Sequence, residues 1–148
     1  MYKHILIATD GSELGDKGME HGLKLAAASG AQATVLTVSE PLPAQAAQFA
    51  QLGGIQDPTG RYDQQIDAMM KKRFADIEQR AAAHGVAVEF MHEIDDAPAA
   101  AIVRFAKLHN CDLIVMASHG RRGIRRFVLG SQTAEVVTTT TIPVLVVR

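Results

Sequence analysis

A glycine-bearing loop between an apolar run and a helix-like stretch contains the residues best suited to hold an anion. It begins at Ala117, after the apolar residues 113–116, and ends at Ser131, before the helix-like residues 132–140. Glycines in such a loop let the backbone approach a phosphate closely. Unpaired N–H groups at the helix start point toward the ligand, and the helix dipole attracts it. Ser131 can cap the helix or donate its hydroxyl, so the segment predicts a site for a phosphate-bearing ligand.

A second polar loop with a glycine, Thr9-Asp10-Gly11-Ser12, follows the first apolar run of the chain. The sequence has no GxGxxG, and the segment 11–17 lacks the order and spacing of the Walker motif GxxxxGK[ST]. The pattern therefore argues against dinucleotide binding and P-loop chemistry.

Both loops join strand-like and helix-like segments that alternate along the chain. We expect strands over residues 4–9, 32–38, 86–92, 112–117 and 142–147, and helices over residues 12–29, 63–84, 98–109 and 132–140. This alternation predicts a single α/β domain over residues 1–148, a doubly wound parallel sheet of five strands with helices on both faces. The expected inner stripe of the second helix comprises Ile66, Met70, Phe74, Ile77 and Ala81.

The expected strand order is 3-2-1-4-5. Continuous apolar runs at 5–7 and 113–116 suit central strands covered on both faces, whereas Glu89 places the third strand at an edge. In an open parallel sheet the ligand binds at the carboxyl ends of the strands, where the strand order reverses. For this order that point lies between the first and fourth strands, from which the two polar loops leave.

The last strand, 142–147, is continuously apolar although it forms the other edge of the sheet. An open apolar edge invites association unless something covers it. We therefore expect a homodimer through this strand, with a helix of the same chain covering the edge as the alternative.

The segment 39–62 has no convincing period and contains several prolines and glycines. It leaves the carboxyl end of the second strand, on the ligand side of the sheet, so we expect a flexible lid or loop. A short helix over residues 44–51 could interrupt it.

Composition limits the other classes of function. A net charge of −1 gives no electrostatic reason to expect nucleic acid or an anionic membrane as a partner, and no apolar run is long enough to span a bilayer. One cysteine, Cys111, and no segment like a signal peptide indicate a cytoplasmic protein. No metal-ligand spacing is shown by the histidines outside the glycine loop, which are His4, His21, His84, His92 and His109.

Together these segments resemble the universal stress protein family, specifically its ATP-binding branch. The resemblance covers essentially the whole chain and rests on residues 5–12, 111–116, 118–122, 129–131 and 142–146. It implies a Rossmann-like fold similar to that of adenine nucleotide alpha hydrolases. It also implies a dimeric stress-response or signalling module that binds ATP, or AMP or ADP. Mg²⁺ would be carried by the nucleotide, and hydrolysis would be slow at most.

The family's nucleotide motif is a glycine, two residues, a glycine, nine residues, a glycine, and then serine or threonine. Gly120, Gly130 and Ser131 fill the later positions, whereas Ala117 stands at the first. An alanine there should be tolerated if its φ is negative.

The resemblance also assigns roles by matching position. Asp10 is implied to contact the ribose or the base, and Val38 to pair with adenine through its backbone. The implied phosphate cradle comprises Gly120, Gly130, Ser131, Gln132 and Thr133. The implied pocket lining comprises Ala8, Thr9, Met116, Ala117 and His119.

Some of these residues have simpler alternative roles in the structure. Asp10 could cap the first helix or bond into its own turn, and His119 could be a solvated loop residue or pack on a base. The arginines of the loop could clamp a triphosphate or form a solvated basic face; they are Arg121, Arg122, Arg125 and Arg126. Ser12 and Ser131 lack a placed base and acid, so no catalytic residue is assigned and enzyme activity stays undecided.

Two other functions remain open. One is a nucleotide-free dimer that binds proteins or acts like a chaperone, which Ala117 favours. The other is an ATP-dependent enzyme of related fold, such as an adenylyl transferase. It would need a Ser-Gly-Gly type loop after the first strand, and the sequence has Asp10-Gly11-Ser12 there.

Overall fold

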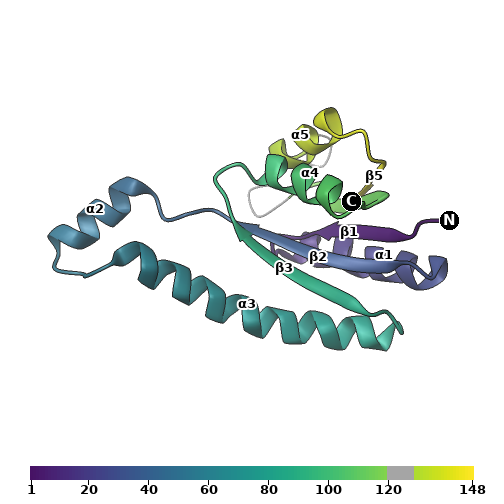
Figure 1. Ribbon diagram of the computed structural model, residues 1–148, viewed down its shortest axis with the longest axis horizontal. Helices are drawn as coiled ribbons and strands as arrows, with labels where there is room; N and C mark the ends of the chain where they lie inside the picture. The colour runs from purple at the N-terminus through teal and green to yellow at the C-terminus, as the bar shows by residue number, and fades with distance from the viewer. Residues whose placement is uncertain (120–128) are drawn as a thin grey trace.

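The computed structural model describes residues 1–119 and 129–148. The strands are β1 (His4–Ala8), β2 (Gln32–Ser39), β3 (Val88–Ile94), β4 (Leu113–Ala117) and β5 (Val144–Val147). The helices are α1 (Glu13–Ser29), α2 (Ala44–Leu52), α3 (Pro58–Ala83), α4 (Pro98–Leu108) and α5 (Ser131–Thr139). Strands and helices alternate as the sequence predicts, apart from the extra helix α2 (Figure 1).

All five strands form one parallel sheet in the order β3-β2-β1-β4-β5. Ile7 of β1 lies opposite Val35 on one side and Val115 on the other, which fixes the register at the centre. The predicted doubly wound fold and its strand order are therefore confirmed. The strand order reverses between β1 and β4, as expected.

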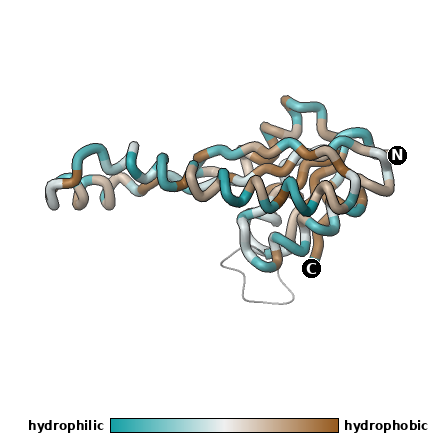
Figure 2. The backbone as a smooth tube through the Cα atoms, turned by 90° about the horizontal axis from the view of Figure 1, so that it is seen from below, coloured by the Kyte–Doolittle hydropathy of each residue, from teal (hydrophilic) through white to brown (hydrophobic). Residues whose placement is uncertain are grey.

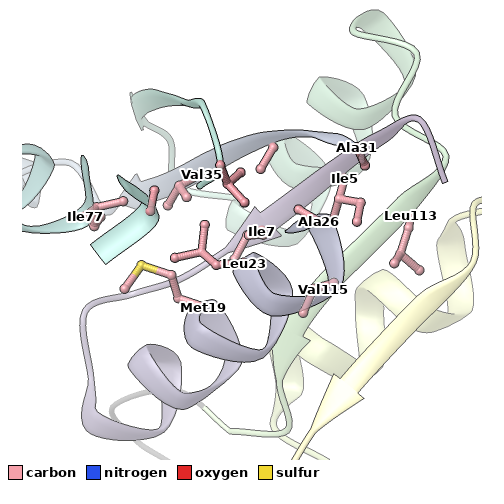
Figure 3. Packing of buried hydrophobic residues seen from close by; sticks show 13 residues of the cluster. Ile5, Ile7, Met19, Leu23, Ala26, Ala31, Val35, Ile77, Leu113 and Val115 are labelled. Atoms are coloured by element: carbon pink, nitrogen blue, oxygen red, sulfur yellow. The ribbon is translucent and has the colours of Figure 1, made fainter. Parts of the chain in front are cut away.

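Two apolar clusters cover the two faces of the sheet because successive residues of a strand point to opposite sides. Ile5 and Ile7 of β1 face the cluster formed with α1 and the end of α3 (Figure 3). Leu6 and Ala8 face the cluster formed with α4 and with Val136 of α5. Each fully buried Ile or Leu contributes about 1.5–3 kcal/mol through removal of its surface from water. The central strands are thus fixed from both sides.

The α2–α3 region differs in part from the sequence expectation. The short helix that could interrupt the segment 39–62 is present as α2, but α3 begins at Pro58 and not at residue 63. Pro58 suits the first helical turn, and Asp57 caps the helix by accepting from the Gly60 N–H. Whether this segment acts as a flexible lid stays a prediction.

The start of α3 does not cover the sheet, whereas Asp67 Oδ1, further along the helix, lies 3.5 Å from His92 Nδ1 of β3. On the expected inner stripe only Ile77 and Ala81 are buried, whereas Ile66, Met70 and Phe74 are half-buried. Figures 1 and 2 show α2 and the start of α3 projecting beyond the end of the sheet. We call residues 41–72 the arm. The inner stripe was predicted too long because the sheet ends before the helix does.

β5 is shorter than predicted and starts at Val144, not at residue 142. Pro143 has no N–H to give to a ladder, although its carbonyl accepts from the Ile114 N–H at 2.9 Å. The Ile142 N–H turns back to the Thr140 Oγ1 at 3.1 Å. All four β5 residues are half-buried and lie at the edge of the sheet.

Within the residues that the structure describes, no helix is both long and apolar enough to cross a bilayer.

Candidate functional site

The loops that leave β1 and β4 lie side by side at the carboxyl end of the sheet. Ala8 pairs in register with Met116, so Thr9 and Ala117 follow at neighbouring positions. The start of α5 is attached to the same place, because the Gly130 N–H donates to the Ser118 carbonyl at 2.7 Å. Most of the sequence-predicted site residues are therefore brought together where β1, β4 and α5 meet, the place at which open parallel sheets have their ligand crevice.

The turn after β1 is ordered by its own side chains. The Gly11 N–H donates to Thr9 Oγ1 at 3.3 Å, and the Ser12 N–H donates to Asp10 Oδ1 at 3.0 Å. Ser12 in turn caps α1 by accepting from the Gly15 N–H at 3.0 Å. One oxygen of Asp10 therefore holds its own turn, which fixes where the carboxylate stands at the mouth of the crevice.

Gly15 permits this arrangement, and the sequence patterns did not indicate it. A Cβ at this position would lie 2.8 Å from Asp10 Oδ1 and 2.9 Å from Thr9 Oγ1. These separations are shorter than real Cβ contacts, so a side chain at this position would displace the Asp10 and Thr9 oxygens from the arrangement that the structure shows. In the sequence, the only signal for this contact was the presence of a glycine in the first turn of α1.

Ala117 fits at the first motif position. Among the described residues other than glycine, only Asp57 and Asn110 have positive φ, so Ala117 does not need a glycine for its backbone. A Cβ on Gly18 would lie 3.6 Å from the Ala117 Cβ, which places the alanine methyl against α1. The departure from the family motif therefore introduces no backbone strain, and the methyl contacts α1.

The start of α5 presents its backbone to the crevice. Gly130 is the N-cap residue, with φ −58° and ψ 152°, and no side chain caps the helix there. The first N–H groups of a helix have no acceptor within the helix. Ser131, at the first helical position, is exposed. This terminus is suited to receive an oxyanion.

The side chains of Gln132 and Thr133 serve the fold. Thr133 Oγ1 is buried and donates to the Ala117 carbonyl at 2.8 Å. Gln132 Oε1 accepts from the Ala99 N–H at 3.1 Å, at the start of α4, where Ala97 offers no side-chain cap. Because both side chains are engaged in the fold, these two residues can contribute to a phosphate cradle only through their backbone N–H groups.

Val38 lies on β2 just past the end of β1. The pairing of β1 with β2 ends at Ala8 opposite Leu36, and the Thr9 N–H donates to the Leu36 carbonyl at 3.0 Å. Val38 is half-buried beyond this point. Its backbone therefore borders the crevice on the β2 side.

The rest of the glycine loop is only partly described. Ser118 Oγ lies 3.1 Å from His119 Nδ1, at the exit of β4. Gly120 of the predicted cradle lies outside the described residues, as do Arg121, Arg122, Arg125 and Arg126. Across residues 1–119 and 129–148, no group of three or more His, Cys, Asp or Glu side chains is arranged to hold a metal ion.

Cys111 and His4 form a contact at the opposite end of the sheet. The Cys111 Sγ lies 3.7 Å from His4 Nδ1, but that nitrogen also lies 3.0 Å from the His109 carbonyl, which can only accept. Nδ1 therefore carries the proton. Burial, and to a lesser extent Asp112, raise the pKa of the Cys111 thiol to about 11. The pair is not an activated nucleophile.

The doubly wound sheet and the crevice at its strand-order reversal place the chain in the Rossmann-like class of α/β proteins. The model of the Universal stress protein family matches residues 1–148, and the chain belongs to that family.

Curated relatives match along the whole chain. It is 30% identical to the universal stress protein YxiE of Bacillus subtilis, with 100% of both chains covered. It is 29% identical to the universal stress protein MJ0531 of Methanocaldococcus jannaschii, covering 100% of this chain and 83% of the relative.

Solved structures share the fold. MJ0577, the subject of a structure-based assignment of biochemical function, superposes with a TM-score of 0.81 at 24% identity, covering 99% of this chain and 96% of that one. A universal stress protein in complex with cAMP gives a TM-score of 0.72 at 24% identity, with 99% and 97% covered. The Archaeoglobus fulgidus universal stress protein in complex with dAMP gives 0.67 at 20% identity, with 99% and 98% covered.

Proposed function

We propose that this chain binds an adenine nucleotide, ATP in the first place, in the crevice between β1, β4 and α5. The observation that carries the proposal is the hydrogen bond from the Gly130 N–H to the Ser118 carbonyl. It holds the start of α5 at the end of β4, beside the Thr9–Asp10 turn. An anion-binding helix terminus thus lies next to a carboxylate that suits a ribose or an adenine amino group. The cAMP and dAMP complexes of two structural neighbours support the same ligand class.

In this proposal the nucleotide lies across the strand ends. Asp10 contacts the ribose or the base, and the Val38 backbone pairs with adenine. Phosphate oxygens bind the hydroxyl of Ser131 and backbone N–H groups of the cradle, which comprises Gly120, Gly130, Ser131, Gln132 and Thr133. Ala8, Thr9, Met116, Ala117 and His119 line the remaining surface. Mg²⁺ arrives with the nucleotide, bound to its phosphates.

The output of the module is a change in binding to another protein, with slow hydrolysis at most. Ser118, beside His119, is buried. Ser39 Oγ lies 2.8 Å from His92 Nε2, and His92 Nδ1 lies 3.5 Å from Asp67 Oδ1, but this group belongs to β2, β3 and α3 and not to the crevice between β1, β4 and α5. We place the module in the cytoplasm, because its single cysteine fits a reducing compartment. We also propose a homodimer in which β5 pairs with β5 of a second copy. Its four half-buried residues form a short apolar edge that such pairing would cover.

The test is the nucleotide content of freshly purified protein, measured by denaturing it and separating the supernatant by ion-exchange chromatography. We expect about one adenine nucleotide per chain, or stoichiometric uptake of added Mg-ATP. The identity of the released nucleotide distinguishes ATP from ADP, AMP and cyclic forms. An empty protein that also takes up no Mg-ATP would overturn the proposal.

A nucleotide-free interaction dimer is the second candidate, and the arm favours it. Residues 41–56 carry no charged side chain, and Phe49, Leu52 and Ile55 are exposed there. Such a surface suits contact with another protein. This candidate predicts a dimer whose partner binding is the same with and without nucleotide.

A further inference from the structure

Arg73 of α3 reaches the proposed nucleotide site from outside the crevice. Its Nη2 donates to Asp16 Oδ1 at 2.8 Å and to Thr9 Oγ1 at 3.3 Å. Asp16 belongs to the first turn of α1, and Thr9 begins the turn that carries Asp10. One guanidinium group thus connects α3 both to α1 and to the turn after β1 that carries Asp10.

Thr9 Oγ1 is the point at which this connection acts. It accepts from Arg73 and also from the Gly11 N–H at 3.3 Å. With both donors in place, the hydroxyl oxygen is held between α3 and the turn, which fixes the backbone on either side of Asp10. Gly15 leaves room for the arrangement, since a Cβ there would lie 2.9 Å from the same oxygen.

Arg73 also lies between the arm and the buried end of α3. Beyond it toward the carboxyl end, Ile77 and Ala81 are buried against the sheet. Before it, in the arm, Met70 is half-buried and Met69 is 61% exposed. The Arg73 side chain is only 18% exposed, so its ion pair is shielded from solvent more than a surface pair would be. This contact ties α3 to α1 and to the turn after β1, and within the arm Asp67 Oδ1 lies 3.5 Å from His92 Nδ1 of β3.

We propose that Arg73 is a positioning residue for the nucleotide site and that it couples occupancy of that site to the arm. The inference rests on the proposed function. By holding Thr9, Arg73 keeps Asp10 in the conformation that receives the ribose or base. Because binding linkage is reciprocal, a nucleotide that orders the Thr9–Asp10 turn also stabilises the contact with α3. Occupancy is thus transmitted to the surface that the arm offers to a partner.

The test compares Arg73→Met with Arg80→Met. Arg80 is a matched control because it also lies on α3 and approaches Asp16, at 3.7 Å, but it pairs with Asp76 at 3.1 Å and does not contact Thr9. Titration with Mg-ATP should show affinity reduced about 3-fold or more in Arg73→Met and nearly unchanged in Arg80→Met. Arg73→Lys, which keeps a cation and its donors, should recover affinity toward the wild-type value.

Hydrogen exchange at saturating nucleotide gives the readout for coupling. Nucleotide should slow amide exchange over residues 58–73 in the wild type and in Arg80→Met, and this protection should be lost in Arg73→Met. Equal affinity and equal protection in wild type and Arg73→Met would overturn the inference and leave nucleotide binding standing. Equal losses in both variants would assign the effect to the charge near Asp16 and also overturn it. A wild type that binds no adenine nucleotide would overturn the proposed function together with the inference.

Discussion

The hydroxyl of Thr133 donates a 2.8 Å hydrogen bond to the carbonyl of Ala117, and this buried contact joins the start of α5 to the end of β4. The two residues are 16 positions apart, and the loop between them contains the predicted nucleotide motif. The contact therefore closes that loop at its base and sets the distance between the strand end and the helix terminus.

Replacement of Thr133 by Val should destabilise the protein and weaken nucleotide binding. The variant keeps the shape of the side chain but leaves the buried Ala117 carbonyl without its donor, which costs about 1–2 kcal/mol of unfolding free energy. Urea unfolding and Mg-ATP titration measure the two effects. Thr138→Val is the control, because that hydroxyl donates to the Ala134 carbonyl within α5 and is exposed. Equal effects of the two substitutions would contradict the closing role of Thr133.

Replacement of Gly130 by Val should abolish nucleotide binding and preserve the fold. The φ and ψ of Gly130, −58° and 152°, are available to valine, so the backbone accepts the change. The added side chain would occupy the place where a phosphate approaches the helix terminus. We expect affinity for Mg-ATP to fall by at least about tenfold, with an unchanged circular dichroism spectrum. Gly53→Val, at the end of α2 with φ −79°, is the matched control. Unchanged affinity in Gly130→Val would show that the phosphate site is elsewhere.

Replacement of Val146 by Lys should convert the dimer to monomers. Val146 is half-buried in the edge strand β5, and a lysine there would bring two like charges together across paired copies. Light scattering measures the mass in solution. Val137→Lys provides the comparison, since Val137 is 41% exposed and belongs to α5 and not to the edge strand. A dimer that persists in Val146→Lys would place the interface on another surface.

The Cys111 thiol should react slowly in the folded protein. With a pKa of about 11, the fraction present as thiolate at pH 8 is about one in a thousand. Alkylation by iodoacetamide at pH 8 should be about a hundredfold slower than in denaturant, from this effect and from burial. Because folding raises the pKa of the Cys111 thiol, the contribution of this thiol to the free energy of unfolding is complete below about pH 8.5. That contribution is lost as the pH rises toward 11. Alkylation at the rate of the unfolded chain would contradict this assignment, and Cys111→Ala should reduce the loss of stability between about pH 8.5 and 11.

The sequence alone determined the order of elements, the sheet topology and the end of the sheet at which we propose the site. These follow from local signals, namely apolar periodicity, glycines at loops and the rule that ligands bind where strand order reverses. The same signals indicated the loops at Asp10 and Gly130 and an apolar last strand.

Only the tertiary structure decided how those loops are held. Arg73 and Thr9 are 64 residues apart, and Gln132 and Ala99 are 33 apart, so no local pattern could pair them. The inner stripe of α3 was predicted too long for a related reason. A periodic apolar face shows that a helix can be buried, but the extent of the sheet decides how much of it is. Where two distant segments meet depends on the packing of the whole chain, and that packing places Arg73 behind the turn that carries Asp10.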